Sequence, residues 1–304
     1  MYDWDALARV WSRKRPQQLW RRHSDCVYRE LVERWIPKSI GSVLKTDAFD
    51  EAFSAGVYPA LQPRARTVVA IDVSSTVLAQ AQARYSGLRC VCADVRDLPL
   101  ASGSIDAVVS FSTLDHFESK TDLEAGLREL ARVLRPDGTL LLTLDNLACP
   151  VIALRRVLPF RLLHALGVVP YHVGWTCGPR RLEGMLEEAG LDVCRTDTIV
   201  HCPRLLAVGL AAVLDRTAGS RLHGWFLGML RRLERLGTLP TRFLTGHFIA
   251  VLARKPRVLA TDDRSCDRND HAVRVPFVSP EFAVIDKQPA MPSVGPAFFK
   301  SRVR

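Results

Sequence analysis

The chain has 304 residues, a hydrophobic fraction of 48% and a formal net charge of +10 at pH 7. This length suffices for one complete α/β domain with additions, and no apolar run approaches the roughly 20 residues of a membrane-spanning helix. The first residues lack the basic start and apolar core of a signal peptide, so we expect a cytoplasmic protein. Eight cysteines without metal-clip spacing are typical of reduced core thiols, and no metal site is expected.

The positive charge is concentrated in two segments. Residues 146–181 contain five arginines and no acid, and residues 203–254 contain eight arginines against two acids. The net positive charge of these two segments accounts for the whole positive charge excess of the chain. Charge localised beside apolar residues suggests an anionic lipid surface, a phosphate or another acidic substrate. The basic, tryptophan-rich stretch over residues 1–41 carries no base-stacking motif, so we do not expect nucleic acid as a partner.

In chain order, residues 1–41 predict an N-terminal helical segment that either covers a ligand site or packs on a sheet. After a short strand at 42–44, four apolar runs alternate with helical patterns, which predicts parallel strands buried on both faces. The runs cover residues 68–71, 88–93, 105–111 and 139–144 and end at Asp72, Asp94, Ser112 and Asp145. Because ligands bind beyond the carboxyl ends of parallel strands, these polar ends predict a binding site.

The remaining elements include two long connections. Helices are predicted at 75–85, 122–134 and 182–189, a turn at 135–138, and strands at 191–202 and 246–255. The connections at 147–180 and 203–245 are longer than packing requires and predict cap insertions. In the second, one helical face is expected to carry Leu222, Trp225, Phe226, Met229, Leu230, Leu233 and Leu236, and the opposite face Arg221, Arg231, Arg232 and Arg235.

Three interpretations of these insertions stay open at this point. They form a cap enclosing an apolar or acidic acceptor, they lie on a membrane surface with arginines at the headgroups, or they form a helical subdomain with a solvated basic face. Residues 256–304, rich in proline and without sustained periodicity, predict a flexible tail.

A resemblance to a known family is carried by four consecutive segments, VVAIDVS, CADVRDLP, SIDAVVSFSTLDHF and LRELARVLRPDGTLLLTLDN. Together they resemble the S-adenosylmethionine-dependent methyltransferases with the Rossmann-like fold. The resemblance covers about residues 42–255. It implies an α/β three-layer domain with a mostly parallel seven-stranded sheet and an antiparallel last strand, flanked by residues 1–41 and 256–304. It also implies S-adenosylmethionine as the cofactor.

Two acids are the expected anchors of the cofactor's nucleoside. Asp72 is placed to accept hydrogen bonds from both ribose hydroxyls, and Asp94 to accept one from an exocyclic amine; the alternative for each is a capping acid in a turn. Val73, Val95 and Ser112 complete the expected contacts, with Val95 against the purine face. A dinucleotide enzyme would also use an acid after the second strand, but its G-x-G-x-x-G loop is absent.

The loop after the first strand departs from the family pattern. Where glycines are expected, residues 45–52 read KTDAFDEA. We expect Lys45 to pair with the methionine carboxylate of the cofactor and Asp47 or Glu51 to accept from its amino group. The alternative is a loop that no longer admits cofactor.

Methyl transfer to a hydroxyl or amine benefits from a base of near-neutral pKa. His116 fits this role after the fourth strand, with Asp115 as an orienting partner; a purely structural His116 is the alternative. Second-tier candidates at the same rim are Asp145, Asn146, Tyr171, His172 and His201. The expected function is methyl transfer to a small-molecule or lipid-like acceptor. The alternative is a non-catalytic scaffold that binds a partner or a membrane surface.

Overall fold

A computed structural model of the chain describes residues 4–14, 17–158, 174–217 and 219–257. These residues belong to one compact unit. The tail expected at 256–304 falls almost wholly outside the described residues. None of the helices in the described ranges is long and apolar enough to cross a membrane.

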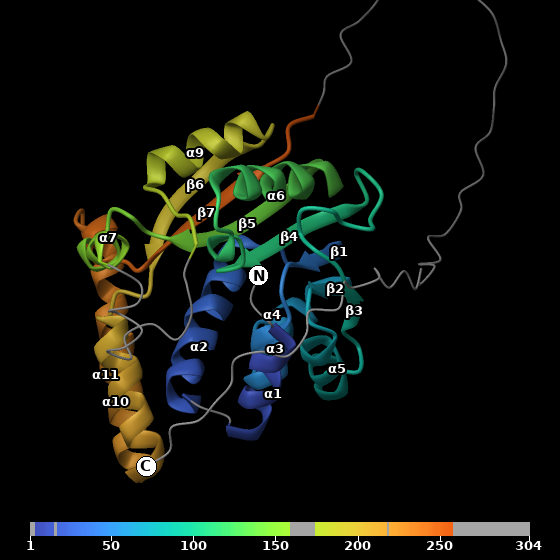
Figure 1. The fold of residues 1–304 in the computed structure, drawn as a ribbon. Helices are drawn as coiled ribbons and strands as arrows, with labels where there is room; N and C mark the ends of the chain where they lie inside the picture. The colour runs from blue at the N-terminus through green and yellow to red at the C-terminus, as the bar shows by residue number, and fades with distance from the viewer. Residues whose placement is uncertain (1–3, 15–16, 159–173, 218, 258–304) are drawn as a thin grey trace, which may run out of the picture. The chain divides into compact units, whose positions relative to one another are not determined.

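A seven-stranded sheet forms the centre of the unit, in the order β3-β2-β1-β4-β5-β7-β6 (Figure 1). The strands are β1 (Ile40–Lys45), β2 (Ala65–Asp72), β3 (Arg89–Cys92), β4 (Ile105–Phe111), β5 (Leu134–Asp145), β6 (Asp192–Ile199) and β7 (Phe248–Arg254). The pairs from β3 to β5 are parallel, whereas β7 runs antiparallel to both β5 and β6. The predicted fold class is confirmed.

Helices cover both faces of the sheet. They are α1 (Trp4–Lys14), α2 (Gln18–Trp35), α3 (Phe49–Phe53), α4 (Tyr58–Leu61), α5 (Ser75–Arg84), α6 (Lys120–Val133), α7 (Pro150–Val157), α9 (Pro179–Glu188), α10 (Arg204–Thr217), α11 (Ser220–Leu233) and α12 (Arg242–Thr245), with short 3-10 helices η1 (Leu114–His116) and η2 (Glu234–Thr238). Figure 1 shows α6 and α9 on one face and α2 to α5 on the other.

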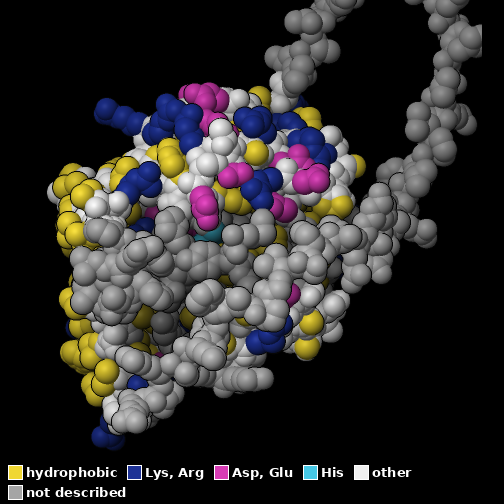
Figure 2. All heavy atoms as spheres, viewed as in Figure 1, with side chains coloured by type: hydrophobic (Ala, Val, Ile, Leu, Met, Phe, Trp, Pro, Cys, Tyr) yellow, Lys and Arg dark blue, Asp and Glu magenta, His cyan; other side chains and the backbone are white. Residues whose placement is uncertain are grey.

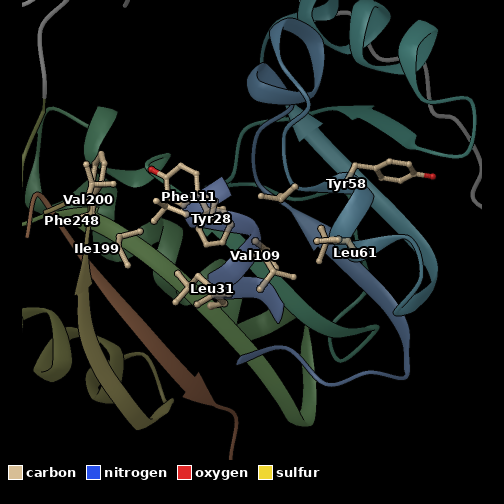
Figure 3. Packing of buried hydrophobic residues seen from close by; sticks show 14 of the residues in the cluster. Tyr28, Leu31, Tyr58, Leu61, Val109, Phe111, Ile199, Val200 and Phe248 are labelled. Carbon is tan, nitrogen blue, oxygen red and sulfur yellow. The ribbon is translucent and has the colours of Figure 1, made fainter. Parts of the chain in front are cut away.

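The alternation of side chains along the strands divides the core into two layers. Val43 and Val109 face the layer that contains α2, α5, α10 and α11, whereas Leu44 and Val108 face α6 and α9. In the first layer Tyr28 of α2 stacks on the β4 residue Phe111, with ring centroids 4.6 Å apart (Figure 3). Helix α2 is therefore part of the core rather than a loose N-terminal extension.

Two local expectations need correction. Helix α6 ends at Val133 and β5 begins at the next residue, so the expected turn at 135–138 lies within the strand, as an irregular stretch in which Asp137 has a φ of +62° and the pairing with β4 shifts between Leu134 and Thr139. At this junction the Lys255 ammonium donates to the Ala131 and Leu134 carbonyls, each at 2.7 Å. A lysine far away in the sequence thus satisfies carbonyls that a helix end leaves without partners.

The second correction concerns the apolar stripe expected on α11. Phe226 and Leu230 are buried as expected, but Trp225 is 61% exposed and Leu222 is 44% exposed. The buried face follows the contact with α2 and α10, which admits only part of the apolar set. At 100° per residue Trp225 shares a face with Arg221 and Arg232, so apolar and basic residues are not on opposite sides.

Candidate cofactor and acceptor site

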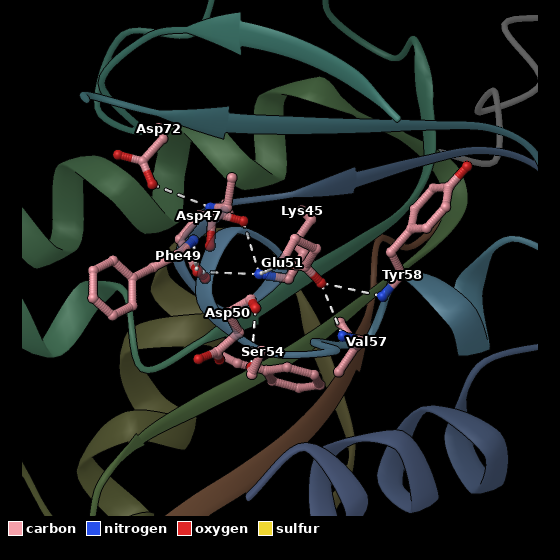
Figure 4. Close-up of polar contacts among 12 residues, drawn as sticks. Lys45, Asp47, Phe49, Asp50, Glu51, Ser54, Val57, Tyr58 and Asp72 are labelled. Carbon is pink, nitrogen blue, oxygen red and sulfur yellow. Dashed lines mark hydrogen bonds and ion pairs between the residues drawn. The ribbon is translucent and has the colours of Figure 1, made fainter. Parts of the chain in front are cut away.

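The loop between β1 and α3 is built around a buried lysine (Figure 4). The Lys45 ammonium donates to the Asp47 carbonyl at 2.7 Å and lies 3.1 Å from Asp47 Oδ1 and 2.9 Å from Glu51 Oε2. Burial alone would lower the pKa of Lys45, but Asp47 and Glu51 outweigh it and raise the pKa above its ordinary value. Lys45 is therefore a charged side chain inside the loop.

Glu51 extends this arrangement to the next helix. Its Oε1 accepts from the backbone N–H of Val57 at 2.8 Å and of Tyr58 at 3.1 Å, at the start of α4. Gly56 has a φ of +58°, and a Cβ there would lie 2.4 Å from Glu51 Oε1. The glycine that this region needs thus lies beyond the loop, where it lets a carboxylate approach the backbone.

This geometry does not support the expected ion pair between Lys45 and a cofactor carboxylate. The ammonium faces three acceptors within the loop, and the side chain is 2% exposed. We reassign Lys45 to holding the loop. Asp47 keeps a side chain that is 20% exposed, so it remains the better placed of the loop's expected contacts.

Asp72 lies at the carboxyl end of β2 and joins it to the loop. Its Oδ2 accepts from Ala48 N at 3.1 Å and its Oδ1 from Ser74 N at 2.9 Å. Burial raises the pKa of Asp72 to about 6, although the two backbone hydrogen bonds oppose the shift. Each carboxylate oxygen has a second lone pair, so these bonds leave acceptor capacity for vicinal hydroxyls. Val73 beside it is 51% exposed.

Asp94 and Val95 are less available to a ligand than expected. Asp94 forms a forked ion pair with Arg96, with Arg96 nitrogens at 2.6, 3.0 and 3.2 Å from its oxygens. Arg96 also reaches Asp122 at 2.7 Å. Val95 is buried in the core layer that contains α6. Its side chain packs against other apolar residues there and does not face a ligand site.

The end of β4 carries a strained residue and a buried acid. Ser112 has a φ of +50°, a conformation that is rare for residues other than glycine and that clusters at functional sites. Its hydroxyl donates to Asp115 Oδ2 at 2.7 Å. Burial raises the pKa of Asp115, and among the described residues its buried Oδ1 has no hydrogen-bond partner. Asp115 therefore pairs with Ser112, and its expected role as the orienting partner of His116 stays a prediction.

His116 is half-buried and packs against the N-terminal helix. Its ring meets the Trp4 ring edge-on at 5.1 Å. The neighbouring residue of α1, Asp5, accepts from Thr76 N at 3.2 Å and pairs closely with the Ser74 hydroxyl. Helix α1 thus contacts the ends of both β2 and β4, as expected for a helix that covers a ligand site.

A hydroxyl network links the ends of β1 and β4, and sequence reasoning did not find it. Thr46 Oγ1 lies 2.9 Å from Ser110 Oγ and 2.8 Å from Thr113 Oγ1, and Thr113 in turn donates to Asp47 Oδ2 at 3.2 Å. The only signal in the sequence is that small hydroxyl residues follow both strands. The network fixes Asp47 relative to β4.

At the end of β5 lies a second buried polar cluster. Asp145 pairs with Arg155 of α7, and His247 Nε2 accepts from Arg204 Nη1 at 3.0 Å and lies 3.5 Å from Asp145 Oδ1. Burial lowers the pKa of His247 to about 3, and Arg204 adds to the effect, so the imidazole is neutral at pH 7. Burial would raise the pKa of Asp145, but the positive charges of Arg155 and Arg204 oppose it and hold the pKa below its ordinary value.

The other second-tier candidates have structural partners. Asn146 donates to the carbonyls of Phe243 at 2.7 Å and Gly246 at 2.9 Å. His201 uses its two ring nitrogens on Thr245 Oγ1 and the Thr198 carbonyl. Tyr171 and His172 lie outside the described residues.

Part of this chain matches a known protein family. Residues 53–142 match a family described as a methyltransferase domain. This part of the chain is similar to a methyltransferase domain. The predicted resemblance to the S-adenosylmethionine-dependent methyltransferases is confirmed.

Relatives agree with this domain. Over 130 residues, 43% of this chain and 44% of the relative, the chain is 31% identical to a probable S-adenosylmethionine-dependent methyltransferase of Mycobacterium tuberculosis. It therefore spans less than half the length of this relative. It is also 26% identical to a probable S-adenosylmethionine-dependent methyltransferase of Mycolicibacterium smegmatis, over 67% of this chain and 69% of the relative.

Solved structures share the fold of the methyltransferase domain. A putative methyltransferase from Haloferax volcanii, solved with the Trm112 methyltransferase activator, superposes with a TM-score of 0.51 and 15% identity, covering 83% of this chain and 95% of the other. A putative sarcosine dimethylglycine methyltransferase from Galdieria sulphuraria has a TM-score of 0.50 and 13% identity, covering 77% and 86%. Identities this low establish the fold alone.

Proposed function

We propose that this chain transfers a methyl group from S-adenosylmethionine to an acceptor bound beside the ends of β4 and β5. The observation that carries the proposal is the position of Asp72: a half-buried carboxylate at the carboxyl end of β2, tied to the β1 loop and with acceptor capacity left. When bound, S-adenosylmethionine supplies a methyl group on a positively charged sulfur. A hydroxyl or amine of the acceptor would displace this methyl group in line, the sulfur–methyl bond electrons would leave with S-adenosylhomocysteine, and His116 would take the proton of the nucleophile.

The hydrogen-bonding and apolar side chains at these strand ends fit this cofactor. Asp72 would accept from the two ribose hydroxyls, Val73 offers an exposed apolar side chain beside it, and Asp47 would accept from the amino group of the methionine part. Lys45 and Glu51 hold the loop that presents Asp47. This arrangement replaces bare glycine backbone by a side-chain ion pair that fixes the loop.

On the acceptor side, His116 is the proposed base and Asp115 the proposed hydrogen-bond acceptor for the nucleophile. His116 is half-buried, and Asp115 Oδ1 is buried without a partner among the described residues, so a donor group of the acceptor would satisfy it. A hydroxyl or amine nucleophile would meet both requirements. A small-molecule or lipid-like compound bearing such a group is the acceptor class we propose.

One observation favours a second function, a non-catalytic scaffold that has lost the cofactor. Arg96 occupies the carboxylate of Asp94 with several hydrogen bonds, and Lys45 is likewise engaged within its own loop. In this alternative the acids paired with Arg96 and Lys45 only stabilise their own loops and bind no cofactor.

Titration with S-adenosylhomocysteine separates the two functions. The enzyme should bind this product, and Asp72→Ala should weaken binding, whereas Asp192→Ala at the exposed start of β6 should not. Equal affinities of the wild type and Asp72→Ala would argue against the proposed site. Transfer of a radioactive methyl group to lipid or small-molecule fractions of a cell extract would then identify the acceptor class.

A further inference from the structure

The solvent-facing side of α10 is apolar. Leu206, Leu210 and Val213 follow one another at the spacing of one helical face and are 73%, 44% and 55% exposed. The adjacent face of the same helix, about 100° further round, is buried through Ala207 and Ala211. In a helix whose outer side meets only water, the outer face is normally polar. Here both faces are apolar.

The neighbouring helix α11 adds a tryptophan flanked by arginines. Trp225 is 61% exposed and Leu222 is 44% exposed, and the exposed Arg221 and Arg232 lie four residues before and seven residues after Trp225, on the same face. Tryptophan has an apolar ring with one polar N–H and is enriched where apolar and aqueous phases meet. Arginines beside it would lie at the level of lipid phosphates.

Helix α7 continues this surface. Val151, Leu154 and Val157 are 47%, 60% and 81% exposed. The helix adjoins the start of α10, because Arg155 of α7 and Arg204 of α10 meet in the same cluster around Asp145 and His247. In Figure 2 hydrophobic side chains gather along the edge that α7, α10 and α11 form in Figure 1.

The exposed apolar residues of the described chain are concentrated here. Of the thirteen large hydrophobic residues that are exposed in the described ranges, only Val10 and Val73 lie outside residues 151–244. Exposed apolar groups scattered singly need no explanation, but a contiguous set marks an interaction surface. We call Leu206, Leu210, Val213, Leu222, Trp225 and the three α7 residues the apolar edge.

Charge identifies the partner of the apolar edge. The two acids of residues 203–254 are engaged within the protein: Asp215 accepts from Leu19 N at 3.1 Å, and Glu234 accepts from Val200 N at 3.0 Å and His201 N at 3.1 Å. The arginines at 156, 216, 221 and 232 are exposed. Basic groups around an apolar surface complement anionic headgroups around hydrocarbon.

From this surface we infer that the apolar edge docks on an anionic lipid bilayer, with its apolar side chains at the acyl boundary and its arginines at the phosphates. The helices lie on the bilayer and do not cross it. This interaction goes beyond methyl transfer and does not depend on it. Because α7 follows β5 directly, docking would also bring the proposed acceptor side of the site close to the lipid.

Cosedimentation of the full chain with lipid vesicles tests the inference. The wild type should sediment with vesicles of phosphatidylcholine mixed with phosphatidylglycerol and remain in solution with phosphatidylcholine alone, and added salt should weaken binding. Arg221→Gln with Arg232→Gln should lower partitioning by about 30-fold, which is about fivefold for each arginine near an anionic surface. Leu206→Glu with Trp225→Glu should abolish it.

A matched control removes the same number of positive charges from another part of the surface. Arg66→Gln with Arg128→Gln removes two exposed arginines at the start of β2 and on α6 and should leave partitioning within about twofold. An unchanged circular-dichroism spectrum and melting temperature of every variant would show that they fold, so failure here is distinguishable from failure of the proposed function. Three outcomes would overturn the inference: no sedimentation of the wild type, equal losses in both arginine pairs, or a dimer in light scattering that Leu206→Glu dissociates.

Discussion

Lys45 Nζ and Glu51 Oε2 lie 2.9 Å apart, and both side chains are almost wholly buried. This ion pair stands where the family to which the chain is similar normally has flexible glycines. It fixes the course of the β1 loop, and the same Glu51 holds the start of α4 through Val57 N and Tyr58 N. The loop and the helix that follows it are therefore stabilised as one unit.

Removing one partner of this pair should destabilise the whole domain. We expect Lys45→Met to lower the free energy of unfolding by about 3–5 kcal/mol, because the buried Glu51 carboxylate loses its counter-ion. Lys45→Met with Glu51→Gln should cost less than Lys45→Met alone. Urea denaturation followed by circular dichroism measures both.

A surface pair provides the control for this comparison. Lys120 and Glu124 form an exposed pair on α6, so Lys120→Met should leave the denaturation midpoint nearly unchanged. If Lys45→Met behaves like Lys120→Met, the buried pair does not hold the loop. If Lys45→Met stays folded in native buffer, S-adenosylhomocysteine and 5′-methylthioadenosine should lose affinity together, since the lysine acts on the loop and not on the amino-acid end of the ligand.

Asp72 should supply a large part of nucleoside affinity. Asp72→Ala removes an acceptor for two hydroxyls and should weaken S-adenosylhomocysteine binding by about 2–4 kcal/mol, from about 1.5–3 kcal/mol per hydrogen bond to a charged group with allowance for non-additivity. Isothermal titration calorimetry measures the loss. An effect below about 0.5 kcal/mol would mean that Asp72 only caps the loop.

The raised pKa of Asp72 gives binding a characteristic pH dependence. Hydroxyl donors favour the ionised carboxylate, so S-adenosylhomocysteine affinity should be full above pH 7 and fall as the pH drops through about 6. At one pH unit below the pKa the loss should be about tenfold. Asp72→Asn should bind weakly and without this dependence, and a wild-type affinity that is flat between pH 5 and 7 would contradict the assignment.

The raised pKa of Asp72 gives folding stability the opposite pH dependence from ligand affinity. Because the folded-state pKa of about 6 lies above the unfolded value of 3.8, the contribution of Asp72 to stability is fully present below pH 3.8 and is lost as the pH rises through 6. Asp25, whose pKa burial also raises to about 6, contributes with the same sign. Stability profiles therefore mix the two acids, and ligand binding is the cleaner measurement.

His116 should affect catalysis without affecting cofactor binding. If it accepts the proton of the nucleophile, His116→Gln should lower kcat by about 10²- to 10⁴-fold. Its S-adenosylhomocysteine affinity should stay close to that of the wild type. A variant with an unchanged kcat would assign His116 to packing against Trp4.

The sheet could be predicted from the sequence because its signal is local. Apolar runs at 68–71, 105–111 and 139–144 are long and lie between helical patterns, and β2, β4 and β5 contain them. The junction at Leu134 could not be predicted, since Lys255, more than a hundred residues later, completes the carbonyls there. Nor could the exposure of Trp225, which depends on how much of α11 the helices α2 and α10 cover.

The site was predictable in position but not in pairing. Asp72, Asp94 and Ser112 lie at strand ends, as the pattern of buried strands indicates. The partners of Lys45, Asp94 and Asp115 follow from side-chain geometry, which spacing in the sequence does not contain. For the same reason the hydroxyl network around Thr46 and the Arg204–His247 contact have no sequence signature beyond residue type.

Calorimetric titration of the full chain with S-adenosylhomocysteine tests the central proposal most directly. We predict saturable binding of one ligand per chain at neutral pH, weakened in Asp72→Ala and unaffected in Asp192→Ala. The absence of heat and of any thermal shift at millimolar ligand, from a chain that is shown to be folded, would contradict cofactor binding and leave the non-catalytic scaffold as the function.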